Sequence, residues 1–202
     1  MLTPPFWRIY FRRLDSTDDR GQAKTVTDNS HGPRWESPES AVVDNGAVHV
    51  SARVDYGTRA MVELAESWSI DPARLTKGDH LARAQDVPAK FLEGILRQLR
   101  QAGLVVSQRG AEGGYRLDKA PEEITVADVV RALDGPLAAV REMRPEDVDY
   151  SGSAAHLREV WVALRAAMRD VLEHTSLADV RDGRLPDRAQ AYLEDPQAWR
   201  RR

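Results

Sequence analysis

Residues 88–117 read PAKFLEGILRQLRQAGLVVSQRGAEGGYRL, and this stretch decides the fold. Its first half repeats apolar side chains at helical spacing. That spacing predicts an amphipathic helix after Pro88, capped by Asp86 or a neighbour and ended by Gly103 in a left-handed conformation. Its second half has β-patterned segments at 104–107 and 115–117, separated by a glycine-rich tip. A helix followed directly by such a hairpin is typical of a winged helix-turn-helix.

The flanking segments supply the other helices of that fold. Residues 53–68 carry apolar side chains on one helical face, and residues 75–84 predict a short second helix. Thr125 is placed to cap a fourth helix that stops at Gly135. We therefore expect residues 48–135 to form a winged helix-turn-helix DNA-binding domain. The predicted fold is mainly α with a small β-hairpin.

One long helix, expected at 153–174, dominates the C-terminal part and follows an irregular segment at 136–152. Its apolar side chains alternate by four and three, as in a coiled-coil seam: Leu157, Trp161, Leu164, Met168 and Val171. The seam packs either on the protein's own core or on a second copy. We expect a dimer interface, because a small winged domain has little else to cover such a helix. Residues 153–183 are thus interpreted as the dimerisation helix and its following segment, and 184–202 as a loose tail.

The N-terminal segment differs from the rest of the chain. Much of 1–47 is rich in Ser, Thr, Asn, Asp, Gly and Pro, a composition that buries too little apolar surface to fold, so we expect an unstructured extension. The run from Phe6 to Arg13 is the exception, and it could instead be a short basic segment for a membrane surface or a partner. Val48 is a plausible native start if an alternative initiation codon encodes it.

Composition excludes several classes of function. The 202 residues include no cysteine, which excludes disulfides, thiolate catalysis, cysteine zinc sites and cysteine-ligated iron–sulfur clusters. The chain has 29 Lys and Arg and 32 Asp and Glu, which give a net charge of −3. Neither this charge nor any basic tail indicates nucleic-acid binding. No apolar run approaches the ~18–20 residues of a membrane span. We expect a cytoplasmic protein without a membrane partner.

Catalytic and metal-binding patterns are missing from the sequence. No two histidines have the i, i+4 spacing of a helical zinc site. The glycines of 110–114 lack the Gly-Lys-Ser/Thr ending of a phosphate-binding loop. We therefore predict neither an enzyme nor a metal site nor a cofactor.

DNA binding gives the predicted arrangement a physical purpose. If the apolar stripe of the third helix packs inward, its outward positions are Lys90, Glu93, Arg97 and either Arg100 or Gln101. Lys and Arg bind phosphates or guanine edges, and Glu accepts a hydrogen bond from cytosine. The hairpin tip carries Arg109, a side chain suited to a narrow minor groove.

Five segments carry a family resemblance: SARVDYGTRA at 51–60, FLEGILRQLRQAGLV at 91–105, SQRGAEGGYRL at 107–117, ITVADVV at 124–130 and SLADV at 176–180. Together they resemble the Rrf2 family of winged helix-turn-helix transcription regulators, which includes IscR and NsrR. The resemblance implies base contacts by Lys90 and Glu93, a minor-groove contact by Arg109 and a phosphate contact by Arg53. Lys90 departs from the family's usual Ser or Thr, which puts the family's target sequence in doubt for this chain.

The resemblance also implies a departure in sensing. Family members that bind a cluster carry three cysteines between the fourth helix and the dimer helix, where this chain has Glu142 near the first position and Ala155 near the last. Asp55 matches a cluster ligand of some members. Without thiolates, we expect a cysteine-less member that holds no cluster and responds to an unknown metabolite or partner protein.

The leading hypothesis is a homodimeric, sequence-specific DNA-binding regulator. The alternative is a winged-helix protein-interaction module that has lost specific DNA binding, as the slightly acidic charge would favour. Binding to the protein's own promoter region distinguishes the two.

Overall fold

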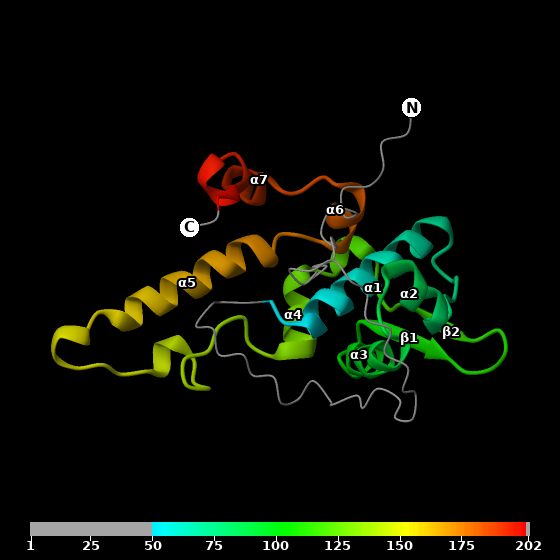
Figure 1. Ribbon diagram of the computed structural model, residues 1–202, viewed down its shortest axis with the longest axis horizontal. Helices are drawn as coiled ribbons and strands as arrows, with labels where there is room; N and C mark the ends of the chain where they lie inside the picture. Colours follow the sequence, from blue (N-terminus) through cyan, green and yellow to red (C-terminus); the bar gives the residue numbers. More distant parts are fainter. Residues whose placement is uncertain (1–49, 201–202) are drawn as a thin grey trace, which may run out of the picture. The chain divides into compact units, whose positions relative to one another are not determined.

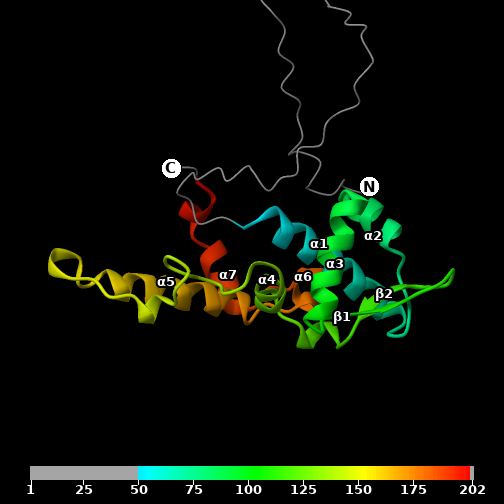
Figure 2. The same cartoon turned by 90° about the horizontal axis from the view of Figure 1, so that it is seen from below.

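The computed structural model describes residues 50–200, and the expectations for 1–47 and Val48 lie outside this range. Its first part follows the order helix, helix, helix, hairpin, helix (Figures 1 and 2). The elements are α1 (Ala52–Ile70), α2 (Gly78–Gln85), α3 (Ala89–Gln101), β1 (Val105–Gln108), β2 (Gly114–Leu117) and α4 (Val126–Asp134).

The core is built around α1, which packs against α2, α3, α4, α6 (Leu177–Asp182) and β2. Met61 and Leu64 of α1 meet the apolar stripe of α3, and all of these side chains are buried: Leu92, Ile95, Leu96 and Leu99. Phe91 lies at the edge of this core, its ring edge-on to that of Tyr56 at 5.7 Å. Because one face of α3 packs against the core, its other face is turned outward.

The turn between α2 and α3 differs from the expectation. Asp86 does not cap α3; it ends α2 in a left-handed conformation (φ 51°), and Pro88 holds the cap position of α3 without a side-chain hydrogen bond. The tight turn requires this conformation, and aspartate tolerates it better than most side chains. The turn is sealed by Val87, which is 5% exposed and whose amide donates to the carbonyl of Ala82.

The second helix also begins later than expected, at Gly78 rather than at residue 75. The reason is tertiary. The amide of Thr76 donates to the carbonyl of Tyr115 at 2.8 Å, and the amide of Tyr115 donates back to Thr76 at the same distance. Thr76 thus pairs with the hairpin instead of starting a helix.

The C-terminal part contains a projecting arm, which we define as residues 136–172. It consists of an irregular segment with two 3-10 turns (Pro145–Asp147 and Gly152–Ala154) followed by α5 (Leu157–Leu172). The arm extends away from the winged part in Figure 1. α5 starts later than the expected residue 153, because the chain forms the second 3-10 turn first.

After the arm the chain returns to the winged part. The amide of Leu177 donates to the carbonyl of Ile124, and that of Val126 to Thr175, both at 2.9 Å. Thr125 and Ser176 each begin their helix with a capping box and pair with each other in an isolated β-bridge. Leu177 is fully buried in the core. The segment after the arm therefore completes the winged part.

The tail is more ordered than expected. Residues Asp187–Leu193 form α7, in which Ala189 is buried and Arg188 makes an ion pair with Asp170 of α5. A short amphipathic helix of this kind gains its stability from packing against α5. These residues are helical in this structure, whereas a loose tail was expected.

Candidate nucleic-acid interface

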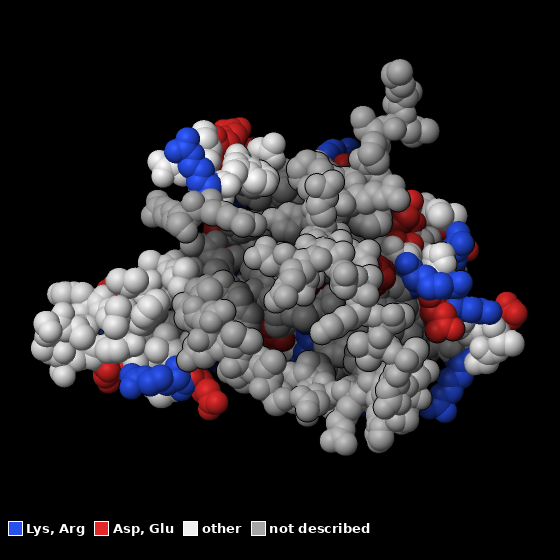
Figure 3. Space-filling view, in the orientation of Figure 1, with Lys and Arg blue, Asp and Glu red and all other residues white. Residues whose placement is uncertain are grey.

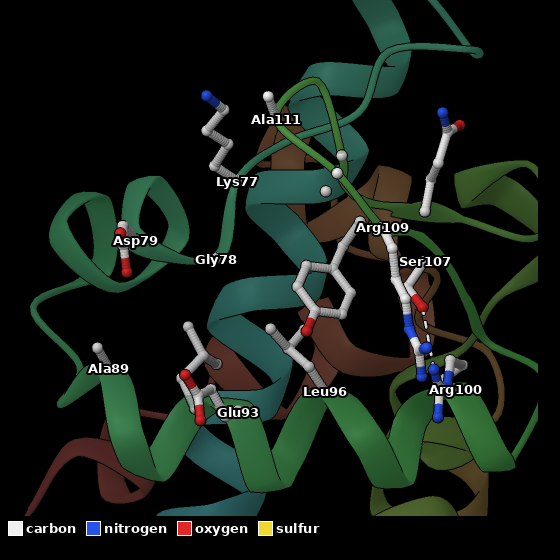
Figure 4. A pocket seen from close by; sticks show the side chains of 16 residues that line it. Lys77, Gly78, Asp79, Ala89, Glu93, Leu96, Arg100, Ser107, Arg109 and Ala111 are labelled. Carbon is white, nitrogen blue, oxygen red and sulfur yellow. Dashed lines mark hydrogen bonds between the residues drawn. The ribbon is translucent and has the colours of Figure 1, made fainter.

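A groove of about 440 Å³ lies between α3 and the hairpin (Figure 4). One wall is α3, with Ala89, Glu93, Leu96 and Arg100, and the other is the hairpin from Ser107 to Tyr115. The start of α2 closes one end of the groove. The groove combines apolar side chains with charged ones, and the cations among them suit contact with phosphate.

The outward face of α3 carries the residues expected there. Lys90, Glu93, Arg97 and Arg100 are all exposed. Glu93 and Arg100 line the groove, whereas Lys90 and Arg97 are not among its lining residues. Arg100 is oriented toward the hairpin, since its Nη1 donates to Oγ of Ser107 at 3.1 Å (Figure 4).

The hairpin is closed by backbone geometry at its tip. β1 and β2 pair antiparallel with Val105 opposite Leu117 and Gln108 opposite Gly114. A Cβ on Gly113 would lie 2.3 Å from the carbonyl oxygen of Gln108, and one on Gly114 would lie 2.7 Å from that of Thr76. Side chains are therefore excluded at both positions. Arg109 is exposed on this glycine-closed tip.

Sequence reasoning missed two residues of this region. Thr76 anchors the hairpin to the body, and its buried hydroxyl donates to Ser67 at 2.9 Å. Lys77 is exposed, lines the groove and holds the cap position of α2, where the helix dipole adds positive potential. The sequence signal for Lys77 was the Gly-Asp that follows it, which marks the true start of α2.

Arg53 makes two hydrogen bonds inside the protein. Its Nη2 donates to Oε1 of Gln98 on α3 and to the carbonyl oxygen of Leu133 at the end of α4, each at 2.7 Å. The side chain is half-buried. In this structure the side chain links α1, α3 and α4. The phosphate contact of Arg53 stays a prediction.

Charge around the groove is mixed rather than uniformly basic. In Figure 3, Lys and Arg side chains alternate with Asp and Glu at the end that carries α2 and the hairpin, on the right. Glu93 and Asp79 stand among Lys77, Arg100 and Arg109 in the groove itself. Affinity for phosphate would therefore depend on a few positioned cations rather than on a broad basic field.

The structure divides the expected dimer seam between two environments. Trp161, Leu164 and Met168 line an apolar cavity of about 400 Å³ formed with the arm's own irregular segment, and Nε1 of Trp161 donates to Tyr150 at 3.0 Å. Leu157, Leu164 and Val171 are half-exposed, and Val160 is 54% exposed. Although α5 is amphipathic, the described chain buries none of its 16 residues.

The positions that the resemblance assigns to a cluster do not fit one. Glu142 lies with Arg141 in a tight turn closed by Val140 and Met143, both central residues having positive φ, and Ala155 has no donor side chain. Asp55 is exposed and pairs with Arg59 at 3.4 Å. Between residues 50 and 200, no three His, Asp or Glu side chains come together as a metal site. Iron–sulfur clusters need soft thiolate donors, and this chain has none.

Within the same range, no helix is both long and apolar enough to cross a bilayer.

Comparison with known proteins places these features in a family. Residues 50–183 match the model of the Rrf2 family, described as iron-dependent transcriptional regulators. An HTH-type transcriptional regulator of Mycobacterium tuberculosis is 48% identical over 151 residues, which cover 75% of this chain and 92% of the relative. The HTH-type regulator CymR of Bacillus subtilis is 35% identical over 65% of this chain and 88% of its own length.

Solved structures agree with the sequence comparison. The structure of CymR, titled the global cysteine regulator of B. subtilis, superimposes with a TM-score of 0.57 at 34% identity, over 68% of this chain and 98% of that one. IscR of T. potens gives a TM-score of 0.54 at 30% identity, over 68% and 89%. These relatives are named as transcriptional regulators and not as enzymes, and the predicted mainly α fold with a small hairpin is confirmed. This chain belongs to the Rrf2 family of transcriptional regulators.

Proposed function

We propose that this family member is a homodimeric, sequence-specific DNA-binding regulator that works in the cytoplasm without an iron–sulfur cluster. The observation that carries the proposal is the exposed face of α3 beside a hairpin that presents Arg109 at its tip and has no room for a side chain at Gly113 and Gly114. A helix presented in this way fits the major groove of B-DNA.

Each exposed side chain has a role in this proposal. Glu93 and Lys90 read base edges in the major groove, and Arg97 contacts phosphate beside them. Arg109 enters the adjacent minor groove, since the glycine-closed tip lets the backbone approach the duplex closely. Lys77 adds a phosphate contact from the start of α2.

Dimerisation through α5 would place two winged parts on one pseudo-palindromic site. The lack of any buried residue in this amphipathic helix supports it. The cysteine-free arm supports regulation by a metabolite or a partner protein instead of by a cluster.

The mixed charge of the groove favours one alternative, a winged-helix module that binds a protein and has lost specific DNA binding. The test is binding of the full chain to fragments of its own promoter region and to scrambled duplexes, at two salt concentrations. The proposal expects preference for one promoter segment, whereas the alternative expects weak binding that ignores sequence.

Glu93→Ala sharpens this test. It should relax discrimination at one base pair of each half-site by about 1–3 kcal/mol while leaving affinity for scrambled DNA equal or higher. Glu112→Ala is the matched control, because it removes the same charge from the exposed hairpin tip without touching α3. Equal effects of the two changes on every duplex would refute base reading by Glu93.

A further inference from the structure

Gly94 lies in the middle of α3, on its exposed face, and the fold gives no reason for a glycine there. A Cβ built at this position meets no atom within 4 Å, and the residue needs no positive φ. This contrasts with Gly113 of the hairpin tip, where a Cβ would lie 2.3 Å from a backbone oxygen.

An exposed glycine inside a helix carries a cost. It loses more conformational freedom on folding than alanine does and lowers helix stability relative to alanine. A local rule broken without a structural gain points to a functional position. In a helix, the function that only glycine serves is to let another molecule approach the backbone closely.

The neighbours of Gly94 identify the class of molecule. Lys90 lies one turn before it and Arg97 one turn after it, at the i−4 and i+3 positions that share its face, and both are exposed. Gln98, one turn after Gly94, is held toward the protein because its Oε1 accepts a hydrogen bond from Nη2 of Arg53 at 2.7 Å. The bare backbone is therefore bracketed by two long cationic side chains, an arrangement that draws a polyanion onto it.

We propose that Gly94 is a specificity-determining position at which a base edge in the major groove packs directly against the α3 backbone. Lys90 and Arg97 hold the flanking phosphates or bases, and the absent side chain sets the depth of the helix in the groove. The inference rests on the proposed DNA-binding function. A Cβ at this position would hold α3 away by about 1.5 Å, the length of one C–C bond.

The test measures thermal unfolding and DNA affinity of the full chain for Gly94→Ala, Gly94→Ser and Gly94→Leu, using the preferred promoter duplex and a scrambled one. Gly94→Ala should raise Tm by about 1–4 °C, since alanine is the better helix former. It should also lower affinity for the preferred duplex about tenfold and leave the scrambled duplex within about twofold. The loss should grow with side-chain size. Ala102→Ser, which adds one atom at the exposed end of the same helix, is the control and should change neither.

The outcomes separate the inference from the function on which it rests. Wild-type affinity and discrimination in Gly94→Ala would overturn the inference and leave the proposed function intact. Equal losses on both duplexes, or a lower Tm, would also overturn it, because the glycine would then serve general affinity or the fold. A wild-type chain that does not distinguish the duplexes would refute the proposed function itself.

Discussion

At the scale of single residues, Arg53 and Arg109 have opposite surroundings although both were expected at DNA. Arg53 donates two hydrogen bonds within the protein, to Gln98 and to the carbonyl of Leu133, whereas Arg109 is exposed at the hairpin tip. Removing Arg53 would leave the Leu133 carbonyl and the Gln98 amide without this donor. The side chain of Arg109 makes no hydrogen bond within the described part of the chain, so removing it would leave no internal group without a partner.

Arg53→Ala should therefore lower the free energy of unfolding by about 1–3 kcal/mol, the range for losing charged hydrogen bonds at a half-buried site. Chemical denaturation measures this directly. If Arg53 keeps these inward bonds when DNA binds, the salt dependence of DNA affinity should keep its slope. Arg109→Ala, measured in parallel, should leave unfolding unchanged and weaken DNA binding. If Arg53→Ala instead left the free energy of unfolding unchanged and reduced the salt slope of DNA affinity by about one unit, Arg53 would contact phosphate.

At the scale of elements, α4 and α5 are joined by Glu173 at the end of α5. Its carboxylate accepts hydrogen bonds from Arg169 at 3.0 Å and from Arg131 of α4. These bonds, that of Arg169 first, lower the pKa of Glu173 below its ordinary value of 4.5. A carboxylate with a lowered pKa stabilises the fold above its ordinary pKa, and the stabilisation is lost as pH falls through the lowered value.

We expect the Tm of the full chain to hold from pH 7 to about pH 5 and to fall below about pH 4.5 as Glu173 and similar carboxylates are protonated. Glu173→Gln should lower Tm at pH 7 and make the acid decline shallower. Glu112→Gln, at the exposed hairpin tip, should do neither. Parallel acid curves for Glu173→Gln and wild type would show that this link contributes nothing.

Elements whose signals are local could be predicted from the sequence. α1, α3 and α4 follow from apolar spacing, and the Thr125 cap follows from its capping box. What depends on distant contacts could not be predicted: the pairing of Thr76 with Tyr115, and α7, which packs on α5. The left-handed Asp86 was missed for another reason, because the tight turn after α2, and not the start of α3, sets its conformation. The outward face of α3 was predictable for the same local reason, whereas the inward bonds of Arg53 depend on α4 and were not.

At the scale of the whole molecule, the unpartnered face of α5 is the feature that sets the proposed assembly. Trp161 and Met168 line the arm's own cavity, and Leu164 lines it too but is half-exposed. The side of the seam left for a second copy therefore carries Val160, the exposed part of Leu164, and Val171. These follow one another at i, i+4 and i+11, a heptad pattern. The interface is thus proposed on a flank next to Trp161 and not centred on it.

The double change Val160→Glu with Leu164→Glu should give monomers in sedimentation velocity, because two carboxylates would be buried without partners. Binding to a two-half-site duplex should weaken accordingly, while the winged part keeps its fold. Ala166→Glu is the control, since it adds a carboxylate on the opposite, exposed face of the helix. If the double variant remains dimeric, the interface lies elsewhere.

Leu177, the buried side chain that follows the arm, has a consequence for the order in which the protein is made. The expected domain, 48–135, leaves the ribosome before Leu177 does, yet the core closes only when Leu177 arrives and its amide binds the carbonyl of Ile124. At about 5–20 residues per second, the wait is on the order of seconds. The whole of α5 is synthesised during that interval. A nascent chain therefore exposes its proposed pairing helix before its DNA-reading part is sealed, which favours assembly between neighbouring chains on one message.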